Sequence, residues 1–243
     1  MIQPLQLSRH RVVVTSSLNI SRPSILLVHG IGVSSRYFTR LVNALVPYYD
    51  VHAVDLPGYG KAPTPPRPLS IEELADLVHE VCDRLQLKTP TLIGQSMGCQ
   101  IVANLAHRKP EVMSRLILLG PTVNKAERHL LIQAWHLCQD TFHEPLSVNR
   151  IVIADYLRMG FRRYLQTSRS MIADRIEDAL ADNPVPTLVM SGSRDKIVPK
   201  EWGVYLAELP QIGEYALIDG APHLLQWTHT DEVARRCREF IES

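Results

Sequence analysis

Short apolar runs alternate with amphipathic helical patterns along most of this chain. Runs such as "SILLVHG" and "RLILLG" contain almost no polar positions, as expected for strands that are buried on both faces. Between them, "SIEELADLVHEVCDRL" spaces its apolar residues along one helix face and begins with the capping-box pair Ser70 and Glu73. Strands connected by such helices form a parallel sheet with helices on both faces. The pattern therefore predicts a doubly wound, mostly parallel α/β fold.

One long segment, residues 121–185, interrupts this alternation. It has no convincing strand pattern, whereas "AERHLLIQAWHLCQ", "VNRIVIADYLRM" and "MIADRIEDALAD" have helical patterns. A crossover between parallel strands needs only about a dozen residues, so most of this segment is an insertion. We predict an α/β core of residues 1–120 and 186–243 and a helical cap of residues 121–185. We expect the cap to cover the edge of the sheet where the parallel strands end, because open α/β sheets bind ligands there.

Composition and charge favour a globular protein that acts on a small molecule. Hydrophobic residues make up 45% of the 243 residues and charged residues 21%, and the net charge is +1. No extended Lys and Arg run indicates a nucleic-acid or membrane-surface partner. The chain has no signal-peptide pattern and no apolar stretch of transmembrane length, and its four cysteines lack CxxC spacing. We expect a cytoplasmic protein with reduced thiols, no cofactor and no metal.

The sequence "GQSMG" places Ser96 between two glycines, after the apolar run "TLI" and before a helical pattern. A serine at such a sharp strand-to-helix turn projects above the sheet edge, and the glycines leave room for the crowded backbone. The alternative is a turn serine without a catalytic role, because Gly and Ser are both common in turns. The position between strand and helix favours a nucleophile.

A serine nucleophile needs a base that removes its proton and a carboxylate that orients the base. Asp195 follows the apolar run "PTLVM", and His223 follows the run "YALID". Asp55 in "DLPGYG" is a rival acid, but it precedes Ser96 in the chain and its Pro-Gly context suits a turn. We therefore predict Ser96 as nucleophile, His223 as general base and Asp195 as the orienting acid.

Acyl transfer also needs donors for the negative charge that develops on the carbonyl oxygen. The backbone N–H of Met97, directly after the nucleophile, is one candidate, and that of Ile31 in "HGIG" is the other. A plain glycine turn would also account for "HGIG". We expect His29 to fix this loop by hydrogen bonding.

Together, "LLVHGIG", "DLPGYG", "GQSMG", "SGSRDKIVP" and "GAPH" resemble the α/β-hydrolase superfamily. The resemblance spans about residues 24–242 and is to the group with a helical cap between the sixth and seventh core strands. It implies a Ser-Asp-His hydrolase with two backbone oxyanion donors. Two features depart from the family pattern: Cys99 stands where many members carry another glycine, and the region before Ser24 is short. We expect the thiol of Cys99 to fill a small buried space and the short region to hold fewer leading strands than usual.

The resemblance also narrows the chemistry. Cap-bearing dehalogenases and epoxide hydrolases carry an aspartate as nucleophile, so Ser96 disfavours both. Carbon–carbon bond hydrolases usually have Asn before the nucleophile and Trp after the histidine, where this chain has Gln95 and Leu224. We expect hydrolysis of a carboxylic ester or a related acyl bond through a Ser96 acyl-enzyme, with carbon–carbon bond hydrolysis as runner-up. The same residues would also suit a cofactor-free perhydrolase or an acyltransferase, and a ligand-binding receptor is a further possibility because fold does not fix function.

Substrate contacts are expected close to the nucleophile and in the cap. Near Ser96 and the loop "HGIG" that carries the predicted donor Ile31, called the oxyanion loop below, the candidates are Tyr37, Phe38, Gln95 and Leu224. Aromatic residues of the insertion are expected to form an apolar wall; they are Trp135, Phe142, Tyr156, Phe161 and Tyr164. The alternative for these aromatic residues is that they pack the cap against the core.

Overall fold

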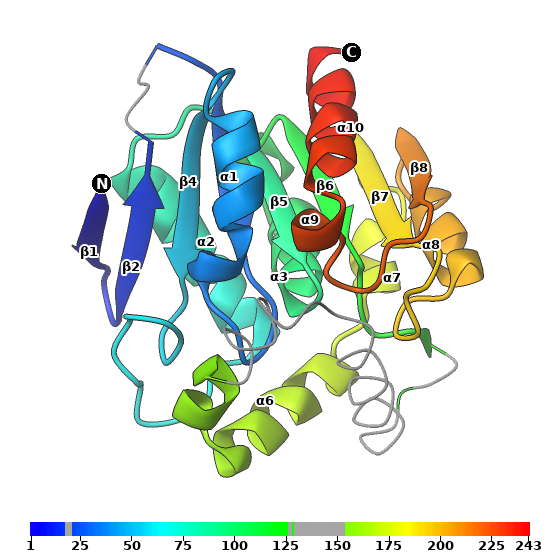
Figure 1. The fold of residues 1–243 in the computed structure, drawn as a ribbon. Coiled ribbons are helices and arrows are strands. Elements are labelled where there is room, and N and C mark those ends of the chain that lie inside the picture. Colours follow the sequence, from blue (N-terminus) through cyan, green and yellow to red (C-terminus); the bar gives the residue numbers. More distant parts are fainter. Residues whose placement is uncertain (18–20, 126–127, 129–153) are drawn as a thin grey trace.

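The structure is a computed structural model that describes residues 1–17, 21–125, 128 and 154–243. Within these ranges, eight strands form one sheet in the order β1-β2-β4-β3-β5-β6-β7-β8 (Figure 1). The strands are β1 (Ile2–Gln6), β2 (Arg11–Ser16), β3 (Ser24–Val28), β4 (Asp50–Asp55), β5 (Thr91–Gln95), β6 (Arg115–Leu119), β7 (Thr187–Gly192) and β8 (Gly213–Ile218). Strands β3 to β8 pair in parallel, and β2 is antiparallel to both β1 and β4. The predicted mostly parallel α/β fold is confirmed.

The expectation of fewer leading strands is wrong, because two strands precede Ser24. β1 and β2 form an antiparallel pair whose turn is closed by a hydrogen bond from Leu7 N to His10 O at 2.9 Å. Antiparallel strands need only a short turn, so the pair fits into a region too short for a parallel crossover. β1 lies at the sheet edge and alternates between exposed and half-buried residues. It therefore lacks the continuous apolar run by which the inner strands are recognised.

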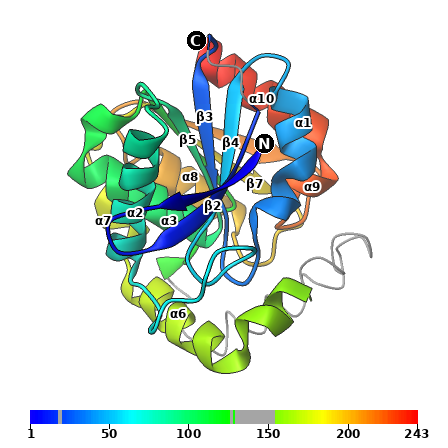
Figure 2. The ribbon, with the colours of Figure 1, turned by 90° about the vertical axis from the view of Figure 1, so that its left-hand side faces the viewer.

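Helices cover both faces of the sheet (Figure 2). One face carries α1 (Thr39–Leu45), α9 (Leu225–Thr228) and α10 (Thr230–Glu242), with the short 3-10 helix η1 (Ser35–Phe38) before α1. The other face carries α2 (Ile71–Arg84), α3 (Met97–Arg108), α7 (Ile176–Leu180) and α8 (Lys200–Ala207). A second short 3-10 helix, η2 (Pro110–Val112), connects α3 to β6. The doubly wound arrangement follows from these two layers.

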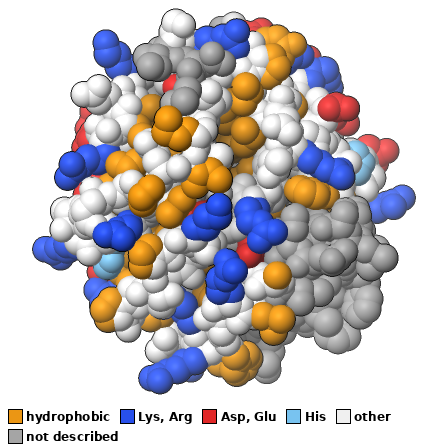
Figure 3. All heavy atoms as spheres, turned by 60° about the vertical axis from the view of Figure 1, so that its left-hand side comes forward, with side chains coloured by type: hydrophobic (Ala, Val, Ile, Leu, Met, Phe, Trp, Pro, Cys, Tyr) orange, Lys and Arg blue, Asp and Glu red, His pale blue; other side chains and the backbone are white. Residues whose placement is uncertain are grey.

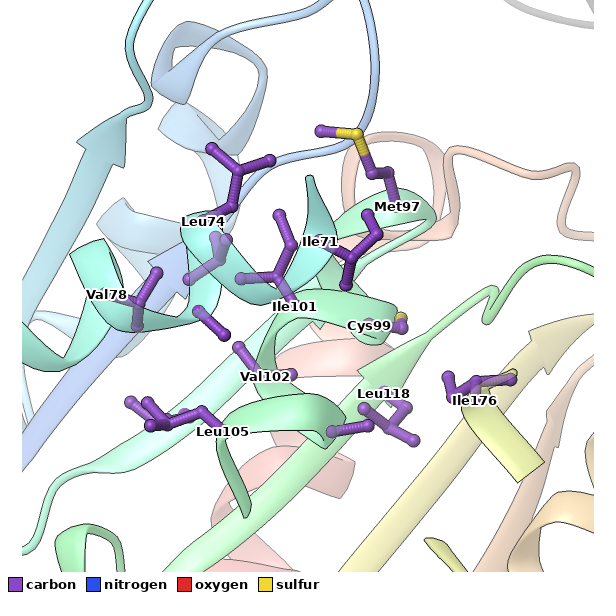
Figure 4. Close-up of a cluster of buried hydrophobic side chains, with 14 of the residues drawn as sticks. Ile71, Leu74, Val78, Met97, Cys99, Ile101, Val102, Leu105, Leu118 and Ile176 are labelled. Atoms are coloured by element: carbon purple, nitrogen blue, oxygen red, sulfur yellow. The ribbon is translucent and has the colours of Figure 1, made fainter. Parts of the chain in front are cut away.

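Two hydrophobic clusters hold the layers to the sheet. In β3, Leu26 and Val28 pack into the cluster under α2 and α3, whereas Ile25 and Leu27 pack under α1 and α10. Such alternation within an apolar strand is what burial on both faces requires. Figure 4 shows the first cluster, in which side chains from α2, α3, β6 and α7 meet. Full burial of each large aliphatic side chain stabilises the fold by about 1.5–3 kcal/mol.

The predicted start of α2 is confirmed by its hydrogen bonds. Ser70 Oγ accepts from Glu73 N at 3.1 Å, and Ser70 N donates to Glu73 Oε2 at 2.9 Å. This reciprocal pair satisfies backbone donors of the first turn that have no partner within the helix.

Most of the described part of the insertion between β6 and β7 is helical. Residues 154–159 form one helical segment, and α6 (Phe161–Ala173) follows it. The pattern "MIADRIEDALAD" is divided, because α6 ends at Ala173 and α7 begins at Ile176. Figures 1 and 2 both show α6 lying across the edge where the parallel strands end. The pattern "AERHLLIQAWHLCQ", with Trp135, lies outside the described residues, as does Phe142.

None of the described helices is long and apolar enough to span a membrane. Lys and Arg side chains occur among uncharged ones across the face shown in Figure 3. The expectation that the protein acts on a small molecule stays a prediction.

Candidate active site

Ser96 occupies a sharp turn between β5 and α3. Its backbone has φ 54° and ψ −120°, in the left-handed region that residues with a side chain seldom adopt. Such a conformation costs on the order of 1–3 kcal/mol and persists only where the surrounding structure holds it. Ser96 N donates to Leu119 O at 3.0 Å, which ties the turn to the end of β6. Ser96 is 8% exposed. The turn therefore places the side chain at the edge where the parallel strands end.

The two glycines of "GQSMG" are required by space. A Cβ atom at Gly98 would overlap Val28 O, and one at Gly94 would overlap the backbone of Gly98. The adjacent Cys99 is buried, and its Sγ lies 3.2 Å from Gly94 O, as a small thiol in a confined space. Burial raises the pKa of the Cys99 thiol well above its usual value, so the thiol stays neutral. The turn therefore presents Ser96, the predicted nucleophile, next to a thiol that is buried and neutral.

Asp195 and His223 are brought together from two successive strand ends. Asp195 follows β7 and His223 follows β8, and His223 Nδ1 lies 2.8 Å from Asp195 Oδ2. Asp195 Oδ1 accepts from Ile197 N at 2.8 Å and from Val198 N at 3.0 Å. The Asp195 side chain has 0% exposure and that of His223 has 6%. This arrangement fixes the imidazole ring through Nδ1.

The end of β6 connects this pair to the serine. Gly120 directly follows β6, and a Cβ atom there would lie 3.0 Å from His223 Cε1. The preceding residue, Leu119, supplies the carbonyl to which Ser96 N is bonded. In addition, Gln95 Nε2 donates to His223 O at 3.4 Å. The structure therefore gathers the three predicted residues at one place. Sequence reasoning missed Gly120, whose signal is a glycine directly after the apolar run of β6.

The loop after β3 passes beside the serine. A Cβ atom at Gly30 would lie 3.0 Å from Ser96 Cβ, so Gly30, the residue before Ile31, adjoins Ser96. Met97 is the first residue of α3, and the amides of a first helical turn have no partner within the helix. The two predicted oxyanion donors therefore belong to the residues that directly follow Ser96 and Gly30, which lie next to each other.

His29 fixes this loop by hydrogen bonds, as the sequence predicts. His29 Nε2 accepts from Leu56 N at 3.1 Å, so the proton of the neutral ring is on Nδ1, which donates to Gly30 O at 2.7 Å. Burial lowers the pKa of His29 and favours this neutral form. The imidazole thus bridges "HGIG" to "DLPGYG".

Tyr37 and Phe38 lie behind the loop rather than on an accessible wall. Both side chains have 0% exposure and pack in the cluster under α1 and α10. Tyr37 Oη donates to Gln95 Oε1 at 2.6 Å and accepts from Gly30 N at 3.1 Å. The expectation that these two residues contact substrate is therefore corrected: Tyr37 supports the loop, and Phe38 belongs to the core. Burial also raises the pKa of Tyr37 well above its usual value, so its hydroxyl stays protonated.

Asp55, the rival acid, accepts hydrogen bonds from backbone amides of two loops. Its Oδ1 accepts from Ser35 N at 2.7 Å, and its Oδ2 accepts from Lys61 N at 2.9 Å. The carboxylate thus closes two loops, as the Pro-Gly context indicated.

Residues of the insertion between β6 and β7 lie directly against the loop that follows β3. A Cβ atom at Gly32 would lie 2.7 Å from Tyr156 Cζ, and the Tyr156 and Tyr164 ring centroids are 5.4 Å apart. Phe161, in contrast, is 77% exposed and is not part of a wall with them. Leu224 is buried beside His223, at the start of α9. Among the described residues, no group of three His, Cys, Asp or Glu side chains could hold a metal ion.

Comparison with known proteins matches residues 23–150 to the family model described as the alpha/beta hydrolase fold. The chain is 28% identical to the uncharacterized hydrolase YugF of Bacillus subtilis, over 92% of each chain. It is also 28% identical to the pimeloyl-[acyl-carrier protein] methyl ester esterase of Neisseria meningitidis serogroup C, over 90% of this chain and 93% of the esterase. The crystal structure of an enol-lactonase from Burkholderia xenovorans superposes with a TM-score of 0.86 at 19% identity, covering 99% of this chain and 100% of the lactonase.

Proposed function

This chain belongs to the α/β-hydrolase family, and we propose that it is a serine hydrolase that cleaves a carboxylic ester or a related acyl bond. The observation that carries the proposal is the buried Asp195–His223 hydrogen bond beside the strained turn of Ser96. An aspartate that fixes a histidine next to a serine is the arrangement that activates a hydroxyl group near neutral pH. The methyl ester esterase among the relatives supports an ester as the bond that is cleaved.

In the first half of the proposed reaction, Ser96 Oγ attacks the carbonyl carbon while His223 Nε2 accepts the hydroxyl proton. The carbonyl oxygen becomes negatively charged and accepts hydrogen bonds from the amides of Ile31 and Met97. One such donor is worth about 2.7–4 kcal/mol of transition-state stabilisation. The tetrahedral intermediate then collapses, and the leaving alcohol takes the proton from His223.

In the second half, water attacks the Ser96 acyl-enzyme. His223 removes a proton from the water, and a second tetrahedral intermediate forms against the same two amides. Collapse releases the carboxylic acid and returns the proton to Ser96. Asp195 holds the imidazole through Nδ1 and stabilises the imidazolium in both halves without accepting its proton. Every step uses groups of this chain and water.

The direct test is the substitution Ser96→Ala. We expect the variant to fold as the unmodified protein does, but to lose turnover of p-nitrophenyl esters and covalent labelling by a fluorophosphonate probe. Ser21→Ala is the matched control, because Ser21 is an exposed serine before β3, at the opposite end of the parallel strands. Labelling or turnover that persists in purified Ser96→Ala contradicts the assignment of the nucleophile.

A substrate panel distinguishes ester hydrolysis from carbon–carbon bond hydrolysis and from binding without turnover. Esters of graded acyl length, thioesters, lactones and a dienone are supplied to the unmodified protein under identical conditions. Preference for esters supports the proposal, and preference for the dienone favours carbon–carbon bond hydrolysis instead. A protein that binds these compounds without turnover and without a Ser96 adduct is a binding module, and the proposal is then wrong.

A further inference from the structure

A buried carboxylate of the insertion is not used by the mechanism above. Asp155 lies in the helical segment 154–159 and is only 5% exposed. Its Oδ2 accepts from Ser34 Oγ at 2.6 Å, and its Oδ1 lies 3.8 Å from Arg36 Nη1. Both partners belong to the core, in the chain that leads from β3 into α1. Because a buried charge is retained only where it is compensated, this contact specifies how the segment sits on the core.

The next residue of the segment contacts the same stretch of loop. The Tyr156 ring occupies the space above Gly32, where a Cβ atom would lie 2.7 Å from Cζ. Gly32 itself has φ +74°, in the left-handed region, so its conformation and its contact with the ring both favour glycine. Asp155 and Tyr156 therefore contact the two ends of the stretch Gly32–Ser34, directly after Ile31.

The core holds this loop at its two ends. Gly30 is fixed through Tyr37 and His29, and Ser35 N donates to Asp55 Oδ1 at 2.7 Å. Between these anchors, Val33 packs in the cluster under α1 and α10, and Ser34 O accepts from Tyr37 N at 3.2 Å. The insertion adds the carboxylate that accepts from Ser34 Oγ and the ring above Gly32. The amide of Ile31 thus lies between Gly30, which the core fixes, and the stretch Gly32–Ser34, which the core and the insertion fix together.

We propose that Asp155 is a positioning residue that sets the oxyanion loop for catalysis, so that the oxyanion donor of Ile31 is in place only when the segment 154–159 is seated. This inference rests on the proposed function. Donors must be aimed at the oxyanion before charge develops, and a displacement of about 1 Å in a reacting geometry costs about 100-fold in rate. The cap then has a part in the chemical step in addition to covering the substrate.

The test compares Asp155→Ala, Asp155→Asn and Ser34→Ala with the unmodified protein. We expect Asp155→Ala to lower kcat for a p-nitrophenyl ester about 10- to 100-fold and to change KM less than about threefold. Ser34→Ala should give a similar loss of kcat. The double variant of Ser34→Ala and Asp155→Ala should lose no more kcat than Asp155→Ala alone, because both substitutions remove the same Ser34–Asp155 hydrogen bond. Asp155→Asn should recover part of kcat, because its amide oxygen can still accept from Ser34 Oγ.

Affinity for a boronic acid separates loop positioning from a general structural effect. Its tetrahedral adduct with Ser96 places an oxygen where the oxyanion forms, so its affinity should fall by about the same factor as kcat. Hydrogen exchange of the amides in residues 29–36 gives a second readout that needs no activity. We expect faster exchange there in Asp155→Ala and unchanged exchange in the strands.

Asp174→Asn is the matched control. Asp174 is a second acidic side chain of the insertion that is partly buried, and it accepts from Gln100 Nε2 on α3 rather than from the loop. We expect its kcat to stay within twofold of the unmodified protein and its exchange in residues 29–36 to be unchanged.

The outcomes separate the two proposals. Absence of ester turnover by the unmodified protein contradicts the proposed function itself. If the unmodified protein is active, a kcat of folded Asp155→Ala within twofold, or unchanged exchange in residues 29–36, overturns the positioning role. An equal loss of kcat in Asp174→Asn overturns it too. If Asp155→Ala does not fold, Ser34→Ala and Asp155→Asn decide by the same criteria.

Discussion

Two buried aspartates, Asp55 and Asp195, stand at comparable places in this molecule. Asp55 ends β4, Asp195 follows β7, and each accepts hydrogen bonds from two backbone amides. The difference is how the oxygens are used. Asp55 gives one oxygen to each amide, whereas Asp195 gives Oδ1 to both amides and keeps Oδ2 for His223.

This difference teaches that burial and backbone bonding do not distinguish a structural carboxylate from one that serves a histidine. Both aspartates are nearly inaccessible to water, and both are well satisfied. What differs is whether one oxygen is left for a partner at the sheet edge. Substitutions that change one oxygen at a time therefore test the comparison.

The largest effect is expected for Asp195→Asn. The asparagine oxygen can still accept from the amides of Ile197 and Val198, so its NH2 group faces His223 Nδ1. A donor at that place favours the tautomer that carries its proton on Nε2, which cannot act as the base. We expect kcat for p-nitrophenyl esters to fall about 10⁴-fold, with the thermal midpoint of unfolding little changed. A kcat within tenfold of the unmodified protein would show that Asp195 does not orient the base.

A smaller effect of a different kind is expected for Asp55→Asn. Its NH2 group must face the amide of either Ser35 or Lys61, and that partly buried donor loses its acceptor. We expect the free energy of unfolding, measured in urea, to fall by about 1–3 kcal/mol. Activity per titrated active site should fall less than tenfold. A loss of kcat as large as that of Asp195→Asn, without loss of stability, would reverse the roles of the two aspartates.

Asp174 extends the comparison to a carboxylate that accepts from a side-chain amide, that of Gln100. Burial raises the pKa of Asp174 from 3.8 to about 6, against the smaller opposing effect of its bond from Gln100. The unfolded chain therefore releases the proton of Asp174 at a lower pH than the folded protein does. The folded state loses stability from this group between about pH 4 and pH 6, and the loss persists at higher pH.

Asp174→Asn removes that penalty. We expect the variant to be about 1–2 kcal/mol more stable than the unmodified protein at pH 7 and nearly equal to it at pH 4. Urea unfolding at the two pH values measures the difference. Equal stability of both proteins at pH 7 would show that Asp174 is not penalised by burial.

Much of the site could be predicted because its signals are local. The strand-to-helix turn of Ser96 needs Gly94 and Gly98 for space, and that need is visible in five consecutive residues. Asp195 and His223 could be proposed because each follows an apolar run that could only be a strand. The rejection of Asp55 from its order and its Pro-Gly context agrees with the bonds that its carboxylate makes.

Other features escaped prediction because their signals are weak or shared with distant residues. The edge strand β1 has no continuous apolar run, since only inner strands are buried on both faces. Tyr37 was expected at the substrate, but its hydroxyl is taken by Gln95 and Gly30. Asp155 has one sequence signal, a lone acid within an apolar helical pattern, and its partner Ser34 lies 121 positions earlier in the chain.

The sequence by itself determined the order of the inner parallel strands and the helices between them, the turn that presents Ser96, and the strand ends that carry Asp195 and His223. These follow from periodicity, glycine sterics and chain order, which are properties of neighbouring residues. Only the tertiary structure decided how the two oxygens of each aspartate are divided among their partners and which residues of the insertion contact the loop after β3. Those depend on hydrogen bonds between segments that meet only after the sheet has formed, and many sequences with the same local pattern would distribute them differently.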